Sequence, residues 1–330
     1  MPEDQPLIPV FIPSLAAILA NGERSKGSPL TAPEIEAIRD KAACIMMDQA
    51  DAAKMDESRG YRDVNPENCW ADWHRLRAQM TGGYLPKIVL CIPGNDSLRP
   101  NLEPLLRAEN VEHEFRPHDP NMLRAFKSSS ITWPQFTDED LARIDGHSTV
   151  LYALSKNYTA AQAPAVARSF LSLGHRLLDA GGHAIKVESA GISHPATRWA
   201  ELDDTAARGP DLLQQWSALF HAYVVHPIAS KTDLYTCGMH LLGAPDLIIS
   251  TDTLKHTAPN TDPARAAIQL FRSFALYLMA ECQPGQFASG HTFRASQDAP
   301  RYRVTWEPCL DYPEDSFFFN PFGLWRFAVP

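Results

Sequence analysis

The chain has 330 residues, 45% of them hydrophobic and 21% charged, which is typical of a folded globular protein and argues against a disordered one. Its 39 acidic and 30 basic side chains give a formal charge of -9, which repels nucleic acids and anionic lipid, and no basic stripe interleaved with aromatic residues opposes it. The six cysteines occur singly, without a Cys-x-x-Cys spacing, which indicates reduced, buried thiols. We therefore expect a protein that binds neither nucleic acid nor membranes.

The N-terminal part, residues 1–83, is expected to be a small helical subdomain. Its apolar run at residues 7–20 resembles the core of a signal peptide, but Glu3 and Asp4 precede it where a signal peptide carries basic residues. The run is also interrupted by proline and too short to span a membrane. We therefore expect a cytoplasmic location.

Two further helices are predicted in this subdomain. Thr31 is expected to cap the first, whose apolar face would extend to Ile45 and Met46. Pro66 is expected to start a second helical segment, which carries two tryptophans and continues through residues 69–77. The pattern indicates helices joined by loops, not paired strands.

The main domain, residues 84–330, is predicted to be mixed α/β and to be organised around residues 148–194. A β-branched and aromatic run at 149–154, an amphipathic segment at 163–178 and an apolar run at 184–188 predict a strand, a helix and a strand. This order indicates a right-handed β-α-β crossover with parallel strands in a central sheet.

The remaining elements of the main domain follow from shorter patterns. Residues 111–146 are expected to be loop with short helices, and no element is predicted for residues 195–209. Helices are predicted at 98–110, 211–220, 232–242 and from 262 onward, and strands at 87–92, 222–228, 247–250, 302–306, 317–319 and 325–329.

Glu188 and His194 are the candidate catalytic residues. Functional groups in β-α-β units gather beyond the carboxyl ends of the strands, and a carboxylate followed by a histidine could act as an acid/base pair. The alternative is ordinary hydrogen bonding in a loop. Ser189 lacks the Gly-x-Ser-x-Gly frame of a hydrolase nucleophile, which disfavours a serine hydrolase.

Metal and cofactor sites are not expected. His221, His226, His240 and Asp246 form no recognised ligand motif, and on one strand the odd spacing of His221 and His226 would direct them to opposite faces. No glycine-rich frame for phosphate binding is present.

A second candidate site lies in the N-terminal part, where Arg, Tyr and Trp side chains of the kind that dominate protein interfaces occur together. Its members are Arg59, Tyr61, Arg62, Asp63, Trp70 and Trp73. The alternative is that the tryptophans pack the helical part against the main domain, while the charged residues cap or pair.

Two sets of short motifs carry a resemblance to known families. The first set comprises residues 12–15, 27–31, 38–42 and 59–67 and resembles a small family of uncharacterised bacterial proteins. The second comprises residues 188–191, 235–239 and 242–246 and is similar to a bacterial domain of unknown function. The resemblance implies a bacterial protein of the kind found beside secretion and toxin loci, where immunity proteins are common.

Two functions follow as expectations. The first is a cytosolic binding protein, because catalytic frames are missing and the acidic charge suits a basic partner. The resemblance implies that this protein is of the immunity type and neutralises a toxin by occlusion. The second is an enzyme on a small, cationic substrate, with Glu188 and His194 as its acid/base groups.

Overall fold

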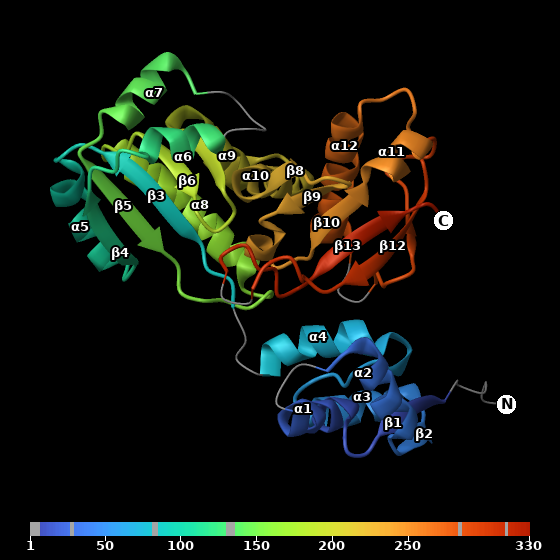
Figure 1. Cartoon of the computed structure of the whole chain (residues 1–330). Helices are drawn as coiled ribbons and strands as arrows, with labels where there is room; N and C mark the ends of the chain where they lie inside the picture. Colours follow the sequence, from blue (N-terminus) through green and yellow to red (C-terminus); the bar gives the residue numbers. More distant parts are fainter. Residues whose placement is uncertain (1–6, 27–29, 81–84, 130–135, 283–285, 314–315) are drawn as a thin grey trace. The chain divides into compact units, whose positions relative to one another are not determined.

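The chain forms two compact units, Met1–Gly83 and Tyr84–Pro330 (Figure 1). The computed structural model describes residues 7–26, 30–80, 85–129, 136–282, 286–313 and 316–330. Helices and strands occur in both units, which confirms the mixed α/β class expected from the sequence. Within the described residues, no helix is long and apolar enough to cross a membrane.

The smaller unit packs its helices around one apolar core and adds a two-stranded antiparallel sheet. Its elements are β1 (Ile8–Phe11), α1 (Leu15–Lys26), α2 (Ala32–Lys41), β2 (Cys44–Met47), α3 (Gln49–Arg59), η1 (Pro66–Asn68) and α4 (Cys69–Met80). The predicted helices after Thr31 and at residues 69–77 are confirmed as α2 and α4.

The expectation that this unit holds no paired strands is wrong. The backbone is already extended at Ala42, so α2 ends before Ile45 and Met46, which lie in β2. There Ile45 is paired with Val10 of β1, far away in sequence. A long-range partner of this kind overrides the local helical pattern.

The larger unit contains two sheets and the helices that cover them. Its first half comprises β3 (Val89–Gly94), α5 (Leu98–Ala108), β4 (Glu112–Pro117), α6 (Met122–Ser128), α7 (Asp138–Asp145), β5 (Thr149–Leu154), α8 (Ala163–Asp179), β6 (Ala184–Val187), β7 (Ile192–Pro195) and α9 (Ala196–Arg208). Its second half comprises α10 (Leu212–Tyr223), β8 (Val225–Ala229), β9 (Asp233–Cys237), η2 (Met239–Leu242), β10 (Asp246–Ser250), α11 (Thr251–Thr257), α12 (Pro263–Leu276), η3 (Tyr277–Glu281), β11 (Thr292–Phe293), β12 (Tyr302–Glu307) and β13 (Leu324–Ala328).

The first sheet has the strand order β4-β5-β3-β6-β7. The predicted strand-helix-strand unit is present as β5, α8 and β6, but its two strands are not neighbours. Both pair antiparallel with β3, which lies between them, so they run parallel to each other. One face of this sheet packs on α5, α8 and α9, and α6 and α7 cover part of the other face.

The second sheet has the order β11-β12-β13-β10-β9-β8 and is antiparallel except for the pair β10 and β13. The helix predicted at residues 232–242 is wrong, because this segment forms β9 and the short turn η2. The strand predicted at residues 317–319 is also absent from the structure. Residues 325–329, predicted as a strand, fall largely in β13, which has a neighbour on each side.

Helix α10 lies where the helices of the two sheets meet, since it packs on α8 and α9 on one side and on α12 on the other (Figure 1). The buried Trp199 of α9 donates from its indole nitrogen to the carbonyl oxygen of Leu171 at 2.9 Å. Gly174 of α8 permits this approach, because a Cβ there would lie 2.7 Å from the indole nitrogen. One continuous core therefore joins the two sheets.

Candidate functional site

Glu188 and His194 lie on either side of a tight turn between β6 and β7, not at a shared strand end. His194 pairs in register with Ile185, which faces the core shared with α8, so the His194 side chain lies on that face of the sheet. Glu188 instead contacts Lys186, which points to the other face because side chains alternate along a strand. The two candidate catalytic side chains are therefore on opposite faces of the sheet.

The surroundings of both residues are those of well-satisfied structural groups. The His194 ring is 2% exposed and donates from Nε2 to the carbonyl oxygen of Ala222 at 3.1 Å, and burial lowers its pKa to about 4. Glu188 accepts a hydrogen bond from Lys186 at 2.5 Å on a partly exposed surface. The acid/base role of this pair stays a prediction, without a shared site to support it.

Three members of the N-terminal set surround the start of α1. Asp63 accepts hydrogen bonds from the backbone N–H groups of Leu15 and Ala16, both at 2.9 Å, and so caps this helix. Arg59 pairs with Asp63 at 3.3 Å and donates to the carbonyl oxygen of Phe11 at 2.7 Å, while the Tyr61 hydroxyl contacts the Ser14 hydroxyl at 2.8 Å. These contacts hold the segment 59–63 against the start of α1 and stabilise the smaller unit.

The other members of the set are divided between core and surface. Trp73 is 1% exposed in the core of the smaller unit, where it donates to Glu23 at 3.1 Å. Trp70 is half-buried against the same core, and Arg62 is exposed. Of the six candidates, Arg62 is the one whose charge is most available to a partner.

The histidines considered as metal ligands lie in different surroundings. His221 is in α10 and His226 is in β8, so their rings come within 5.6 Å of each other instead of lying on opposite faces of one strand. Asp246 accepts hydrogen bonds from Thr236, Asn320 and the backbone of Met239. Among the described residues, no group of three or more His, Cys, Asp or Glu side chains could hold a metal ion.

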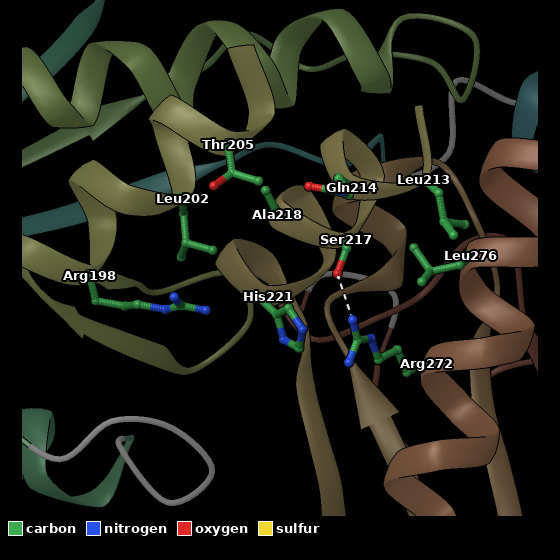
Figure 2. Close-up of a pocket in the computed structure, with 10 residues that line it drawn as sticks. All are labelled: Arg198, Leu202, Thr205, Leu213, Gln214, Ser217, Ala218, His221, Arg272 and Leu276. Carbon is green, nitrogen blue, oxygen red and sulfur yellow. Dashed lines mark hydrogen bonds between the residues drawn. The ribbon is translucent and has the colours of Figure 1, made fainter. Parts of the chain in front are cut away.

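A pocket of about 490 Å³ lies where α9, α10 and α12 meet, and it includes neither Glu188 nor His194 (Figure 2). Its lining contains two arginines, one histidine, other polar groups and several apolar side chains, and none of these residues is acidic. The lining residues are Arg198, Leu202, Thr205, Leu213, Gln214, Ser217, Ala218, His221, Arg272 and Leu276.

The helical periodicity of three segments brings these side chains to one place. In α9 and α12 the lining residues are spaced by three or four positions, and in α10 they follow one face from Leu213 to His221. Other faces of the same helices carry core residues such as Trp199 and Phe274. Each helix therefore packs apolar residues into the core and presents a face of polar and apolar residues to the pocket.

Of the residues that line the pocket, His221 is singled out by the sequence as a possible metal ligand, and the others are not. A signal was present in α9, where Trp199, Leu202 and Ala206 follow helical spacing and are buried. The pocket forms where three helices pack together, and a local sequence pattern does not predict which helices become neighbours.

Two of the side chains that line the pocket are positively charged. The Arg272 guanidinium is 3.5 Å from the Ser217 hydroxyl, and Arg198 forms an ion pair at 3.0 Å with the exposed Glu201. Burial, followed by the charges of His226, Arg272 and Arg198, lowers the pKa of His221 to about 3, so its imidazole is neutral near pH 7. The pocket thus combines cationic and neutral hydrogen-bond donors with apolar walls.

Comparisons of the chain with protein-family models, with curated proteins and with solved structures found no match. Function is therefore inferred from the side chains of this protein alone.

Proposed function

We propose that the chain is a binding protein that holds a small molecule in the pocket between α9, α10 and α12. The observation that carries the proposal is a hollow of about 490 Å³ in which a few polar groups converge among apolar side chains. Ligand pockets usually have volumes of about 300 to 1,000 Å³ and this kind of lining. The place also fits, because clefts between helices are common sites for ligands.

The proposal is tested by filling the pocket. Thr205→Phe adds a ring to the lining and removes only a hydroxyl that bonds the carbonyl of Glu201 in the same helix. Thr197→Phe is the matched control, because it makes the same change at an exposed position of α9 outside the pocket. Both variants and the wild type are screened with a diverse small-molecule library by thermal shift and ligand-observed NMR.

Compounds that stabilise the wild type and Thr197→Phe but not Thr205→Phe are the expected result. A library that yields no compound with this pattern, or compounds that bind all three proteins alike, would contradict the proposal.

Binding of a protein partner, expected from the sequence to be basic, is a second candidate function. The two-stranded sheet of the smaller unit supports it, since an exposed apolar patch often marks an interaction surface and a two-stranded sheet leaves strand edges unpaired. Met46 is 57% exposed, and Asp48 and Asp51 at the start of α3 follow β2 directly. The exposed apolar residues on and beside β1 and β2 are Leu7, Ile8, Ile12, Ile45 and Met46.

This second function is tested with a double variant, Ile45→Ser with Met46→Ser. The exposed Leu310, in the larger unit, supplies the control Leu310→Ser. We expect wild type and control to retain a basic protein from a lysate of the source cell, and the double variant to lose it, as read by mass spectrometry. Equal recovery by all three proteins would show that Ile45 and Met46 do not bind the partner.

A further inference from the structure

The charge of the pocket between α9, α10 and α12 points to the chemistry of its ligand. The chain as a whole is acidic, yet two guanidinium groups and no carboxylate line this pocket. Long-range attraction to an acidic protein would favour cations, so a local excess of positive charge is the feature that needs an explanation.

Arg272 differs from the ion-paired arginines of the larger unit. Arg326, for comparison, contacts both Glu307 and Asp233. Within the described part of the chain, no Asp or Glu forms an ion pair with Arg272, and its guanidinium donates a hydrogen bond to the Ser217 hydroxyl at the long distance of 3.5 Å. Guanidinium carries five N–H donors in a planar fork that matches carboxylate and phosphate oxygens.

The two arginine side chains point into the same part of the pocket. Arg198 and Arg272 extend from α9 and α12 toward His221, which lies between them (Figure 2). Both positive charges disfavour the protonated imidazole and so add to the effect of burial, which is the main cause of the lowered pKa of His221. The apolar part of the lining consists mainly of three leucines, Leu202, Leu213 and Leu276.

We infer that the ligand of this pocket is a small organic oxyanion, a carboxylate or a phosphate monoester, with a short apolar body. Arg272 and Ser217 hold the anionic group, Arg198 adds to the positive potential, and the apolar body packs on the leucines. This inference rests on the proposed small-molecule function and adds the class of ligand.

The probes are hexanoate and hexyl phosphate, with hexanamide as the neutral counterpart of the same chain length. Binding to the full chain is measured by ligand-observed NMR and calorimetry. Arg272→Gln removes the charge and most of the fork, and Arg265→Gln removes the same charge from an exposed position of α12 outside the pocket.

We expect both anions to bind the wild type more tightly than hexanamide, and Arg272→Gln to weaken them about 10- to 100-fold, as the loss of a charge-assisted hydrogen bond does. Arg265→Gln should bind the anions as the wild type does. Arg272→Lys, which keeps the charge without the fork, should recover part of the affinity and so exclude misfolding as the cause. The stronger of the two anions identifies carboxylate or phosphate as the natural group.

Equal binding of all three probes, or anion binding that is insensitive to Arg272→Gln, would overturn the inference, as would the absence of anion binding at millimolar concentration. The proposed function would then be judged separately, because compounds blocked by Thr205→Phe alone would still support a pocket for neutral ligands.

Discussion

Lowering the pH from about 7 to about 4 is expected to destabilise the larger unit by several kcal/mol, mainly through its buried histidines. His194 is 2% exposed and His240 is fully buried. Burial lowers the pKa of each imidazole from 6.5 to about 4. The unfolded chain therefore takes up protons near pH 6.5, whereas the folded chain does so only near pH 4.

The sign of the effect follows from this order of protonation. A histidine with a lowered pKa in the folded state contributes stability that is complete above the unfolded value and is lost as the pH falls toward the folded value. Each of these two residues therefore costs about 3 kcal/mol between about pH 7 and about pH 4. The pKa values of His221 and His226 are lowered too, mainly by burial, so both act in the same direction.

The buried carboxyl of Asp246 acts in the opposite direction. Burial raises its pKa from 3.8 to about 6, although hydrogen bonds from Asn320, Thr236 and Met239 oppose the rise. A raised carboxyl pKa means that the folded state gains stability as the pH falls through about 6, here about 2 kcal/mol. Because several histidines oppose one carboxyl group, the net effect of acid is destabilising.

The measurement is a series of urea unfolding curves between about pH 7 and about pH 4, read by tryptophan fluorescence. His240→Gln should reduce the slope of stability against pH, whatever its effect at neutral pH. His256→Gln, at an exposed position of α11, should leave the slope unchanged. A stability that is flat over this range, or an equal slope in both variants, would show that these histidines do not control the acid response.

Trp199→Ala is expected to destabilise the larger unit by about 3 to 5 kcal/mol, the usual cost of removing a buried tryptophan. The indole is fully buried, with the rings of His194 and Tyr223 at 5.6 and 6.0 Å. The substitution would empty the space between α8 and α9 and remove the indole hydrogen bond to the carbonyl of Leu171. Because α9 also carries Arg198, we expect weaker ligand binding.

Trp199→Phe separates the two contributions to this loss. It keeps an aromatic ring but removes the indole donor, so its cost should be smaller, about 1 to 3 kcal/mol for the lost hydrogen bond together with the lost volume. Chemical unfolding of the three proteins at neutral pH provides the comparison. If Trp199→Ala costs no more than Trp199→Phe, the helices have closed around the cavity and the packing argument fails.

The elements that could be predicted from the sequence are those whose pattern is local. Helices α8 and α12 show several turns of apolar residues at helical spacing, and α12 also has Asp262 as its cap. The segment 232–242 misleads, because the glycine and proline that read as a helix end follow a strand and a short turn. In β9, Leu234 and Thr236 are buried and alternate with Asp233 and Tyr235, a period of two that five residues barely reveal.

The candidate pocket could not be predicted in the same way. Arg198 and Arg272 are 74 positions apart in the numbering, and each is an ordinary polar residue on the outer face of its own helix. Only the placement of α10 between α9 and α12 brings them together. The residues that the sequence did single out, Glu188 and His194, are close in sequence but separated by the sheet itself.

The central place of β13 in the second sheet has a consequence for biosynthesis. This strand ends at Ala328, yet it pairs with β10 on one side and with β12 on the other. During translation, β8, β9 and β10 emerge well before the strand that completes their sheet, at about 5 to 20 residues per second. The unpaired edge of β10 is therefore exposed on the nascent chain, and a chaperone that shields strand edges would act on the larger unit during that interval.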